Sequence, residues 1–268
     1  GIERFNPADG SSLGSLGYDV TESGHGNFNL IPCPTGEYVY GVHYTPYTSG
    51  GGGQANPGTV YQYATDGSGY ATFFLGQYEY DYRGYQCLTI ADDGSYILLS
   101  QGEKIFKIDT STAWDGESDN QNLDRIQHEW KLQDSIGGVA AEQLRVNSIA
   151  ILPDGSRAYA AMNYNNAHSP GNIPGGKVNA FSVLDLQTLG QPVITSLTGA
   201  NSAAQPNWVA AAPDSSAVYG ANSRFMLDFV WRVPVIGSQT YLPDFNSSDP
   251  LHGAYTNAVL SGDGSRYI

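Results

Sequence analysis

The chain has 268 residues and is rich in Gly (33) and Tyr (19), with only 14% charged residues, which is typical of one large, loop-rich all-β domain. Its formal net charge of −14 would repel nucleic acids and anionic membrane surfaces, so we expect neither as a partner. The sequence has no apolar run of about 18 residues, and membrane insertion is therefore not expected.

The first 20 residues contain two strand-like stretches, Ile2–Phe5 and Leu13–Val20, separated by the turn Asn6–Gly10. The same pattern occurs at Val60–Gly67, where it is the third strand and following turn of a longer unit. Residues 1–20 are therefore predicted to be the third and fourth strands of a unit whose first two strands lie elsewhere.

One turn recurs along the chain, at Cys33–Gly36, Ala91–Gly94, Leu152–Gly155, Ala212–Ser215 and Ser261–Gly264. The fourth residues of successive turns are 58, 61, 60 and 49 positions apart. An apolar strand-like stretch precedes each turn, and further stretches follow it. In the best-formed unit the predicted strands are Asn147–Ile151, Ala158–Ala161, Val178–Leu184 and Val193–Leu197. A repeat of this length with four antiparallel strands is a β-propeller blade.

The repeat predicts a single β-propeller domain over residues 1–268. Blades 1 to 4 are expected at residues 26–80, 84–134, 144–198 and 205–245. The closing blade would take its first two strands from residues 253–268 and its last two from residues 1–20. We therefore expect five blades, the last closed from both termini; the alternative is that the chain is part of a larger, for example seven-bladed, ring.

The two cysteines are expected to be buried free thiols. Cys33 lies three residues before its turn glycine, and Cys87 lies seven before its own. On neighbouring parallel strands this stagger is roughly 13 Å at about 3.3 Å per residue. A disulfide tolerates a Cα separation of only about 7 Å.

The unit Pro153–Asn163, followed by Lys177–Asp185, resembles the YVTN-type, lactonase-like propeller repeat. That repeat has a Pro-Asp-Gly turn, a Tyr-x-x-Asn-like second strand and a third strand ending in Asp, and Pro213–Asn222 and Lys104–Asp109 match it in part. The resemblance implies the β-propeller fold. It implies no single chemistry, because the repeat occurs in sugar-lactone hydrolases, muconate-cyclising enzymes, surface-layer proteins and scaffolds.

The resemblance also implies that ligands bind at the face opposite the repeated turns. Seven candidate ligand-binding residues fall there: His25, His43, Arg83, Arg145, Asn163, Asn207 and His252. His25 and His252 lie 11 and 12 residues before their turn glycines, so they could face each other as metal ligands or as acid and base, or be solvated loop residues. Arg83 and Arg145 could together hold a carboxylate or phosphate, or pair with nearby acidic residues.

The acidic loop between Asp109 and Asp124 carries alternating oxygen ligands at Asp115, Glu117 and Asp119. Calcium binds six to eight oxygens, so these residues are a candidate calcium site. The glycine of an EF-hand loop is missing, since Asn120 stands in its place, and the alternative is a solvated acidic loop. No other cofactor is expected.

Alternating Tyr78, Tyr80 and Tyr82 would share one strand face, as in sugar-binding surfaces, or pack between blades. Trp114 and Trp130 are expected to be packing residues. The sequence therefore predicts a non-catalytic extracellular or cell-surface β-propeller that binds carbohydrate or protein. The alternative is a lactonase-like hydrolase or isomerase acting on a small carboxylated or sugar lactone at the channel mouth, with His25 or His252 as acid or base and no assigned catalytic set.

Overall fold

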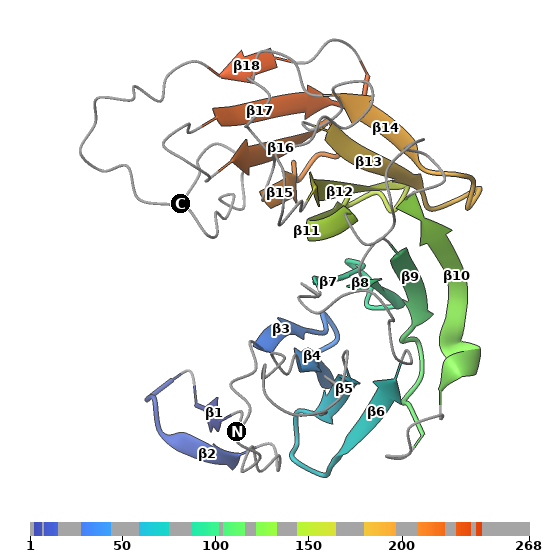
Figure 1. Ribbon diagram of the computed structural model, residues 1–268. Coiled ribbons are helices and arrows are strands. Elements are labelled where there is room, and N and C mark those ends of the chain that lie inside the picture. The colour runs from blue at the N-terminus through green and yellow to red at the C-terminus, as the bar shows by residue number, and fades with distance from the viewer. Residues whose placement is uncertain are drawn as a thin grey trace, which may run out of the picture.

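The computed structural model describes residues 3–6, 8–15, 28–43, 59–74, 87–101, 104–115, 122–132, 144–164, 180–196, 208–222, 229–236 and 240–242 (Figure 1). In these ranges the regular secondary structure is almost entirely β-strand, which confirms the all-β prediction. No helix among the described residues has the length and apolar character needed to cross a membrane.

A hairpin precedes four four-stranded sheets, which we call blades 1 to 4. The hairpin is formed by β1 (Glu3–Phe5) and β2 (Ser12–Ser15). Blade 1 contains β3 (Phe28–Pro32), β4 (Tyr38–His43), β5 (Thr59–Ala64) and β6 (Tyr70–Phe74). Blade 2 contains β7 (Leu88–Ile90), β8 (Tyr96–Gln101), β9 (Lys104–Asp109), a short 3-10 helix η1 (Leu123–Arg125) and β10 (Ile126–Lys131). Blade 3 contains β11 (Leu144–Ile151), β12 (Arg157–Tyr164), β13 (Ala180–Asp185) and β14 (Val193–Ser196). Blade 4 contains β15 (Trp208–Ala211), β16 (Ala217–Asn222), β17 (Phe229–Pro234) and β18 (Thr240–Leu242).

Each blade is an antiparallel sheet whose strands pair in chain order. The described strands form an arc in which the first strands, β3, β7, β11 and β15, lie on the inner side and contact one another in sequence (Figure 1). This is the β-propeller architecture. Residues 253–268, which were predicted to complete the closing blade, lie outside the described part.

The hairpin β1–β2 lies against blade 1. The guanidinium of Arg4 on β1 donates hydrogen bonds to the carbonyl oxygens of Leu13 (2.8 Å) and Thr65 (2.7 Å). Thr65 follows β5, so Arg4 links the hairpin to the turn between the third and fourth strands of blade 1. This contact joins residues that are 61 positions apart in the chain.

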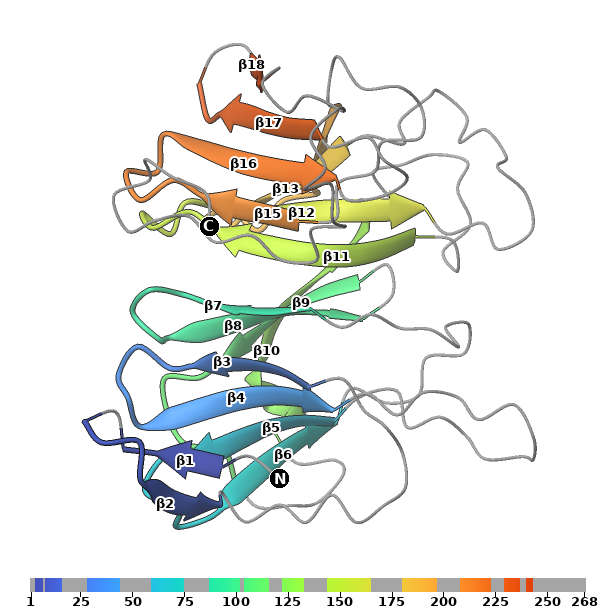
Figure 2. The ribbon, with the colours of Figure 1, turned by 90° about the vertical axis from the view of Figure 1, so that its left-hand side faces the viewer.

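The repeated turn has the same geometry in all four blades. In blade 3 the amide of Gly155 donates to the carbonyl of Leu152 (2.8 Å), and Gly155 has a φ of 67°. This is a type I turn followed by a left-handed residue, a combination that glycine adopts with least strain. The four turns lie on one side of the molecule (Figure 2).

Neighbouring turns also touch. The amide of Asp154 in the blade 3 turn donates to the Ser215 hydroxyl in the blade 4 turn (3.0 Å). In blade 2, a Cβ added to Gly94 would lie 2.9 Å from the Cys33 sulfur of blade 1. The turns of blades 1 and 2, and those of blades 3 and 4, therefore lie against each other at one end of the blades.

Of the four apolar clusters among the described residues, three each lie between two consecutive blades, and the fourth consists of Tyr61 and Tyr63 in blade 1. Leu98, Ile105 and Trp130 of blade 2, for example, pack against Val146 and Met162 of blade 3. Every sheet with a neighbour on each side buries both of its faces, so a single blade would leave apolar surface exposed.

Cys33 and Cys87 are both buried and free, as predicted. Cys33 follows β3 at the turn end of blade 1, whereas Cys87 precedes β7 at the opposite end of blade 2. Burial raises the pKa of the Cys87 thiol to about 12, although the Ser100 hydroxyl 3.0 Å away opposes this shift. The separation of the two cysteines along the strand direction, which was inferred from the repeat, is therefore present in the structure.

Replacing Gly155 by Ala should lower the free energy of unfolding by about 1–2 kcal/mol, because an L residue is strained at this φ. Gly94→Ala should cost more, since Gly94 has a similar φ of 73° and the added Cβ also meets the Cys33 sulfur. Gly155 is the matched control, because nothing lies within 4 Å of its added Cβ. Urea unfolding curves measure both; equal losses would show that the contact between turns contributes nothing.

Acid should destabilise the protein through the turn aspartates. Hydrogen bonds from Ser95, Ser156 and Ser216 hold the pKa values of Asp93, Asp154 and Asp214 below the ordinary value of 3.8. Because the folded pKa is the lower one, this stabilisation is complete above about pH 4 and is lost as the pH falls through the folded pKa.

The triple variant Asp93→Asn, Asp154→Asn, Asp214→Asn keeps a hydrogen-bond acceptor in each turn and cannot titrate. It should lose less stability than the wild type between about pH 5 and pH 2.5. Urea midpoints measured across this range test the expectation. Parallel curves for the two proteins would show that these turns do not carry the acid sensitivity.

Candidate functional site

Three predicted ligand-binding residues lie in described strands, at the end of the blades away from the repeated turns. His43 ends β4, while Arg145 on β11 and Asn163 on β12 are directly opposite each other in the antiparallel register. Such cross-strand partners have Cα atoms about 4.5–5.5 Å apart. The structure therefore brings Arg145 and Asn163 together. His25, Arg83, Asn207 and His252 lie outside the described residues, and their predicted groupings stay predictions.

The candidate calcium loop is described only at its edges. Asp115 is exposed, and its main-chain amide and carbonyl both bond to the Asn122 carboxamide, at 2.9 and 3.1 Å. Asn122 also donates to the carbonyl of Thr72 in blade 1 (3.0 Å), which attaches the base of the loop to the neighbouring blade. Glu117 and Asp119 lie outside the described residues. Within the described ranges, no group of three or more His, Cys, Asp or Glu residues is arranged to hold a metal ion.

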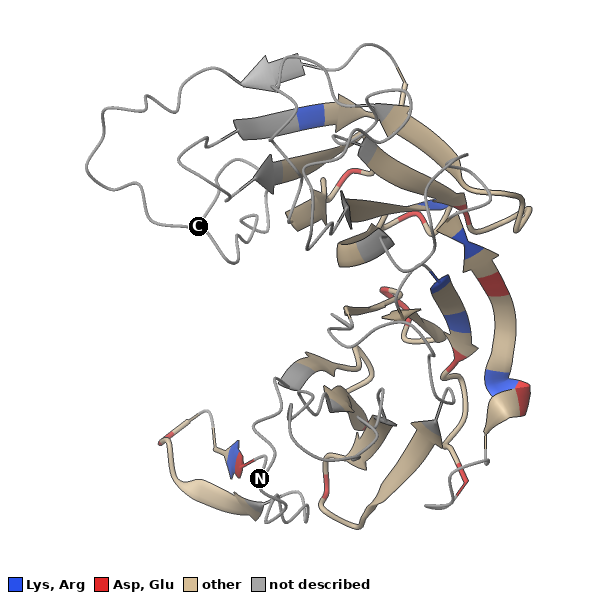
Figure 3. Cartoon of the chain, in the orientation of Figure 1, with Lys and Arg blue, Asp and Glu red and all other residues tan. Residues whose placement is uncertain are grey.

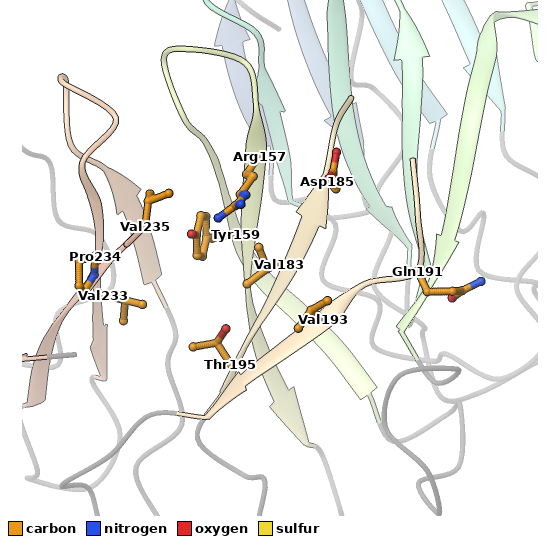
Figure 4. Close-up of a pocket in the computed structure, with 10 residues that line it drawn as sticks. All are labelled: Arg157, Tyr159, Val183, Asp185, Gln191, Val193, Thr195, Val233, Pro234 and Val235. Carbon is orange, nitrogen blue, oxygen red and sulfur yellow. The ribbon is translucent and has the colours of Figure 1, made fainter. Parts of the chain in front are cut away.

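A cavity of about 390 Å³ lies between blades 3 and 4, on the outer side of the arc (Figure 4). Tyr159 and Val233 are buried and form its floor, with Val183, Thr195, Pro234 and Val235 as half-buried walls. Its rim consists of Arg157, Asp185, Gln191 and Val193. The volume is within the range of small-ligand pockets, which extends from about 300 to 1,000 Å³. We call it the inter-blade pocket.

One strand position beside the pocket is occupied by a smaller residue than its equivalents in blades 1 and 2. The fourth strands of blades 1, 2 and 3 carry Phe73, Trp130 and Thr195 at the same register, opposite Val60, Ile105 and Phe181 respectively. The Phe73 and Trp130 side chains are almost fully buried between their blades, at 0% and 2% exposure. Thr195 is too short to reach across to blade 4.

The adjacent Phe181 ring does not fill this space, because it is directed at the second strand of blade 4. An added Cβ on Gly220 of β16 would overlap the Phe181 ring. Phe181 is fully buried and belongs to the apolar cluster between blades 3 and 4. The glycine therefore lets the blades approach on the inner side, while the gap at Thr195 stays open on the outer side.

The rim of the inter-blade pocket carries opposite charges. The amides of Thr188 and Gln187 donate to the Asp185 carboxylate at 2.8 and 3.0 Å and, with nearby Arg157, hold the pKa of Asp185 below its ordinary value. Arg157 also favours the ionised form of Asp154. One guanidinium thus lies near two ionised carboxylates, and Figure 3 shows further Asp and Glu residues at turns among the described residues.

Sequence reasoning directed attention to the opposite end of the blades and missed this pocket. Its one sequence signal is the comparison of fourth-strand residues at equal register, which sets Thr195 against Phe73 and Trp130. That comparison needs the strand pairing, because the loops before the fourth strands differ in length.

The sequence matches no protein-family model and no curated protein. Solved structures are similar in fold at low identity. U3-55K aligns with a TM-score of 0.50 and 11% identity over 81% of this chain and 52% of its own. The β-propeller domain of Cps50 (Swd1) from Myceliophteria thermophila aligns with a TM-score of 0.49 and 11% identity over 74% of this chain and 49% of its own.

Hydrazine synthase from Kuenenia stuttgartiensis aligns with a TM-score of 0.48 and 14% identity over 85% of this chain and 52% of its own. The chain thus spans about half the length of each of these structures. At such identities the likeness concerns the fold alone.

Proposed function

We infer that this chain is a non-catalytic binding module for a protein ligand, acting outside the cell or at its surface. The observation that carries the inference is the inter-blade pocket, with its aliphatic walls and charged rim. Val193 on the rim is 64% exposed, so an apolar wall faces solvent and gains by being covered. The extracellular location is supported by composition alone, namely few lysines and many Tyr, Ser, Asn and Gly residues.

The lining favours protein over carbohydrate. Sugars bind best on exposed aromatic faces edged by polar groups, whereas this pocket is walled mainly by valines. Its aromatic residue, Tyr159, is only 3% exposed. The tyrosines behind the carbohydrate hypothesis, Tyr78, Tyr80 and Tyr82, lie outside the described residues.

The chemistry of the rim favours binding over catalysis. An acid or base acting at neutral pH works best with a pKa near 7. The carboxylate of the pocket, Asp185, has a lowered pKa and remains ionised at neutral pH. It is better suited to a fixed charge that orients a ligand than to proton transfer.

A peptide-display selection against the immobilised protein tests this function. Val193→Asp places a charge on the aliphatic wall, and peptides selected on the wild type should bind this variant at least about tenfold more weakly. Leu123→Asp is the matched control, since Leu123 is a 42% exposed aliphatic residue on blade 2. Failure to enrich any peptide, or equal binding to both variants, would contradict the proposal.

The lactonase-like alternative has one observation in its favour, the pairing of Arg145 with Asn163. Arginine and asparagine are residue types that can hold a substrate carboxylate or lactone oxygen, and the strand register makes these two cross-strand partners. This alternative requires the wild type to hydrolyse gluconolactone above the protein-free rate, and Arg145→Ala to lower kcat/KM at least about tenfold. A wild-type rate equal to the spontaneous one would eliminate it.

A further inference from the structure

The strand register orders the blade 3 side of the inter-blade pocket into a charged row and an aliphatic row. Arg157 on β12 is opposite Asp185 on β13. Two residues further along, Tyr159 is opposite Val183, which is itself opposite Val193 on β14. Residues two apart share one face of a sheet, and all five line the pocket between blades 3 and 4. A guanidinium therefore lies directly beside an aliphatic wall.

Two hydrogen-bond donors of this face have no acceptor in the described part of the chain. They are the Arg157 guanidinium and the Tyr159 hydroxyl, and both residues line the pocket. Arg157 is half-buried, and Tyr159 is only 3% exposed. By contrast, Arg4 in the hairpin and Arg125 in blade 2 each donate to protein oxygens. Polar groups withdrawn from water are usually paired, so a ligand acceptor between blades 3 and 4 would complete both.

Asp185 does not occupy the guanidinium. Although Arg157 and Asp185 are register partners, no ion pair within 4.0 Å joins them. The Asp185 carboxylate instead accepts the amides of Gln187 (3.0 Å) and Thr188 (2.8 Å) in the turn before β14. In Figure 4 the guanidinium is directed toward the Tyr159 side of the pocket and away from Asp185. Arg157 can therefore bind an acceptor placed between the two blades.

A carboxylate attached to an aliphatic group fits this surface. The planar guanidinium presents paired N–H groups that match the two oxygens of a carboxylate, and the tyrosine hydroxyl can donate one more hydrogen bond. Most of the remaining wall is aliphatic, with valines from both blades: Val183, Val193, Val233 and Val235. The terminal residue of a polypeptide has both groups on one carbon atom, a free carboxylate and, in Leu, Ile or Val, a branched side chain.

The apolar surface also continues beyond the pocket. Val193 is 64% exposed, and Ile236, which follows Val235 of the lining, is 90% exposed. A ligand that covers these side chains must extend past the cavity, as a polypeptide does. We propose that the inter-blade pocket binds the C-terminal residue of a partner polypeptide, its carboxylate on Arg157 and Tyr159 and its aliphatic side chain against the valines. Capture of a terminal carboxylate is a recurring mode of peptide recognition.

The negative charge of the chain acts on such a ligand at longer range. Repulsion between a ligand carboxylate and the net charge of −14 slows association and is screened by salt. The hydrogen bonds from Arg157 and Tyr159 act at direct contact. Asp185→Asn keeps an acceptor for the turn before β14 and removes one nearby negative charge, so this variant should bind the ligand as tightly as the wild type or more tightly.

The proposal rests on the proposed function and is tested with synthetic peptides. Calorimetry should give acetyl-Gly-Ser-Leu, which has a free carboxylate, a Kd of about 1 mM or tighter. Acetyl-Gly-Ser-Leu-amide lacks the charge, and acetyl-Gly-Ser-Gly lacks the aliphatic side chain, so each should bind at least about tenfold more weakly. The same loss is expected for acetyl-Gly-Ser-Glu-amide, whose carboxylate is on a side chain, and for 4-methylpentanoate, which has no peptide groups.

Arg157→Gln removes the guanidinium and should weaken binding of acetyl-Gly-Ser-Leu at least about tenfold. Arg232→Gln is the matched control, because Arg232 is a half-buried arginine on β17 that is not part of the pocket lining. Tyr159→Phe keeps the buried ring, removes only the hydroxyl and should weaken binding about threefold or more. Urea midpoints show whether each variant is folded; if Arg157→Gln is not, Tyr159→Phe carries the test.

Equal binding of the free-carboxylate and amide peptides would overturn the proposal, as would unchanged binding in Arg157→Gln or weaker binding in Asp185→Asn. Equal binding of the glutamate peptide or of 4-methylpentanoate would also overturn it, because the ligand would then be an internal acidic residue or a small acid. Peptides selected with free C-termini that require Val193 but bind equally well after amidation would overturn this inference and leave the binding function standing. If neither the selected nor the synthetic peptides bind at the pocket, both fail.

Discussion

The structure depends on the burial of each sheet against the next one along the chain. A four-stranded blade has two apolar faces, and the three largest clusters of the described core each draw residues from two consecutive blades. The buried surface holds the blades side by side. The strand register places equivalent residues of successive blades at equivalent positions in successive interfaces. Contacts between turns, such as that from Asp154 to Ser215, add directional bonds at one end of this stack.

Within this arrangement, the size of one fourth-strand residue determines how far that residue fills the outer part of the interface with the next blade. A large ring at this position closes the space, as Trp130 does, and a neighbouring segment can add another ring, as Trp114 does. A short polar residue leaves room, as Thr195 does. One position in a repeated unit can therefore convert packing surface into a binding surface without altering the strand order or the inner core.

Much of the fold could be predicted from the sequence, because its signals are local. The repeated turn ends on a left-handed residue, which is glycine in blades 1 to 3 and Ser215 in blade 4, and it sets the phase of these four blades. The strands predicted for blade 3 correspond to β11–β14. The spacing of the same turns also predicted that Cys33 and Cys87 lie too far apart to form a disulfide, and both are free thiols. Trp114 and Trp130 were correctly predicted to be packing residues, but the sequence did not indicate between which blades each of them packs. The pocket could not be predicted, because it depends on side-chain volumes facing each other across two blades, and its lining runs from Arg157 to Val235.

The short residue at Thr195 also bears on how the molecule comes apart. Where each repeat touches only its neighbours, stability is approximately a sum of terms for single interfaces, and the poorest interface opens at the lowest free energy. Between blades 3 and 4, the fourth-strand residue of blade 3 is the short Thr195, whereas the equivalent residues Phe73 and Trp130 are buried in the other two interfaces, so this position contributes less apolar burial there. A ligand seated beside Thr195 would contact both blades, so that its binding free energy would also stabilise the interface between them.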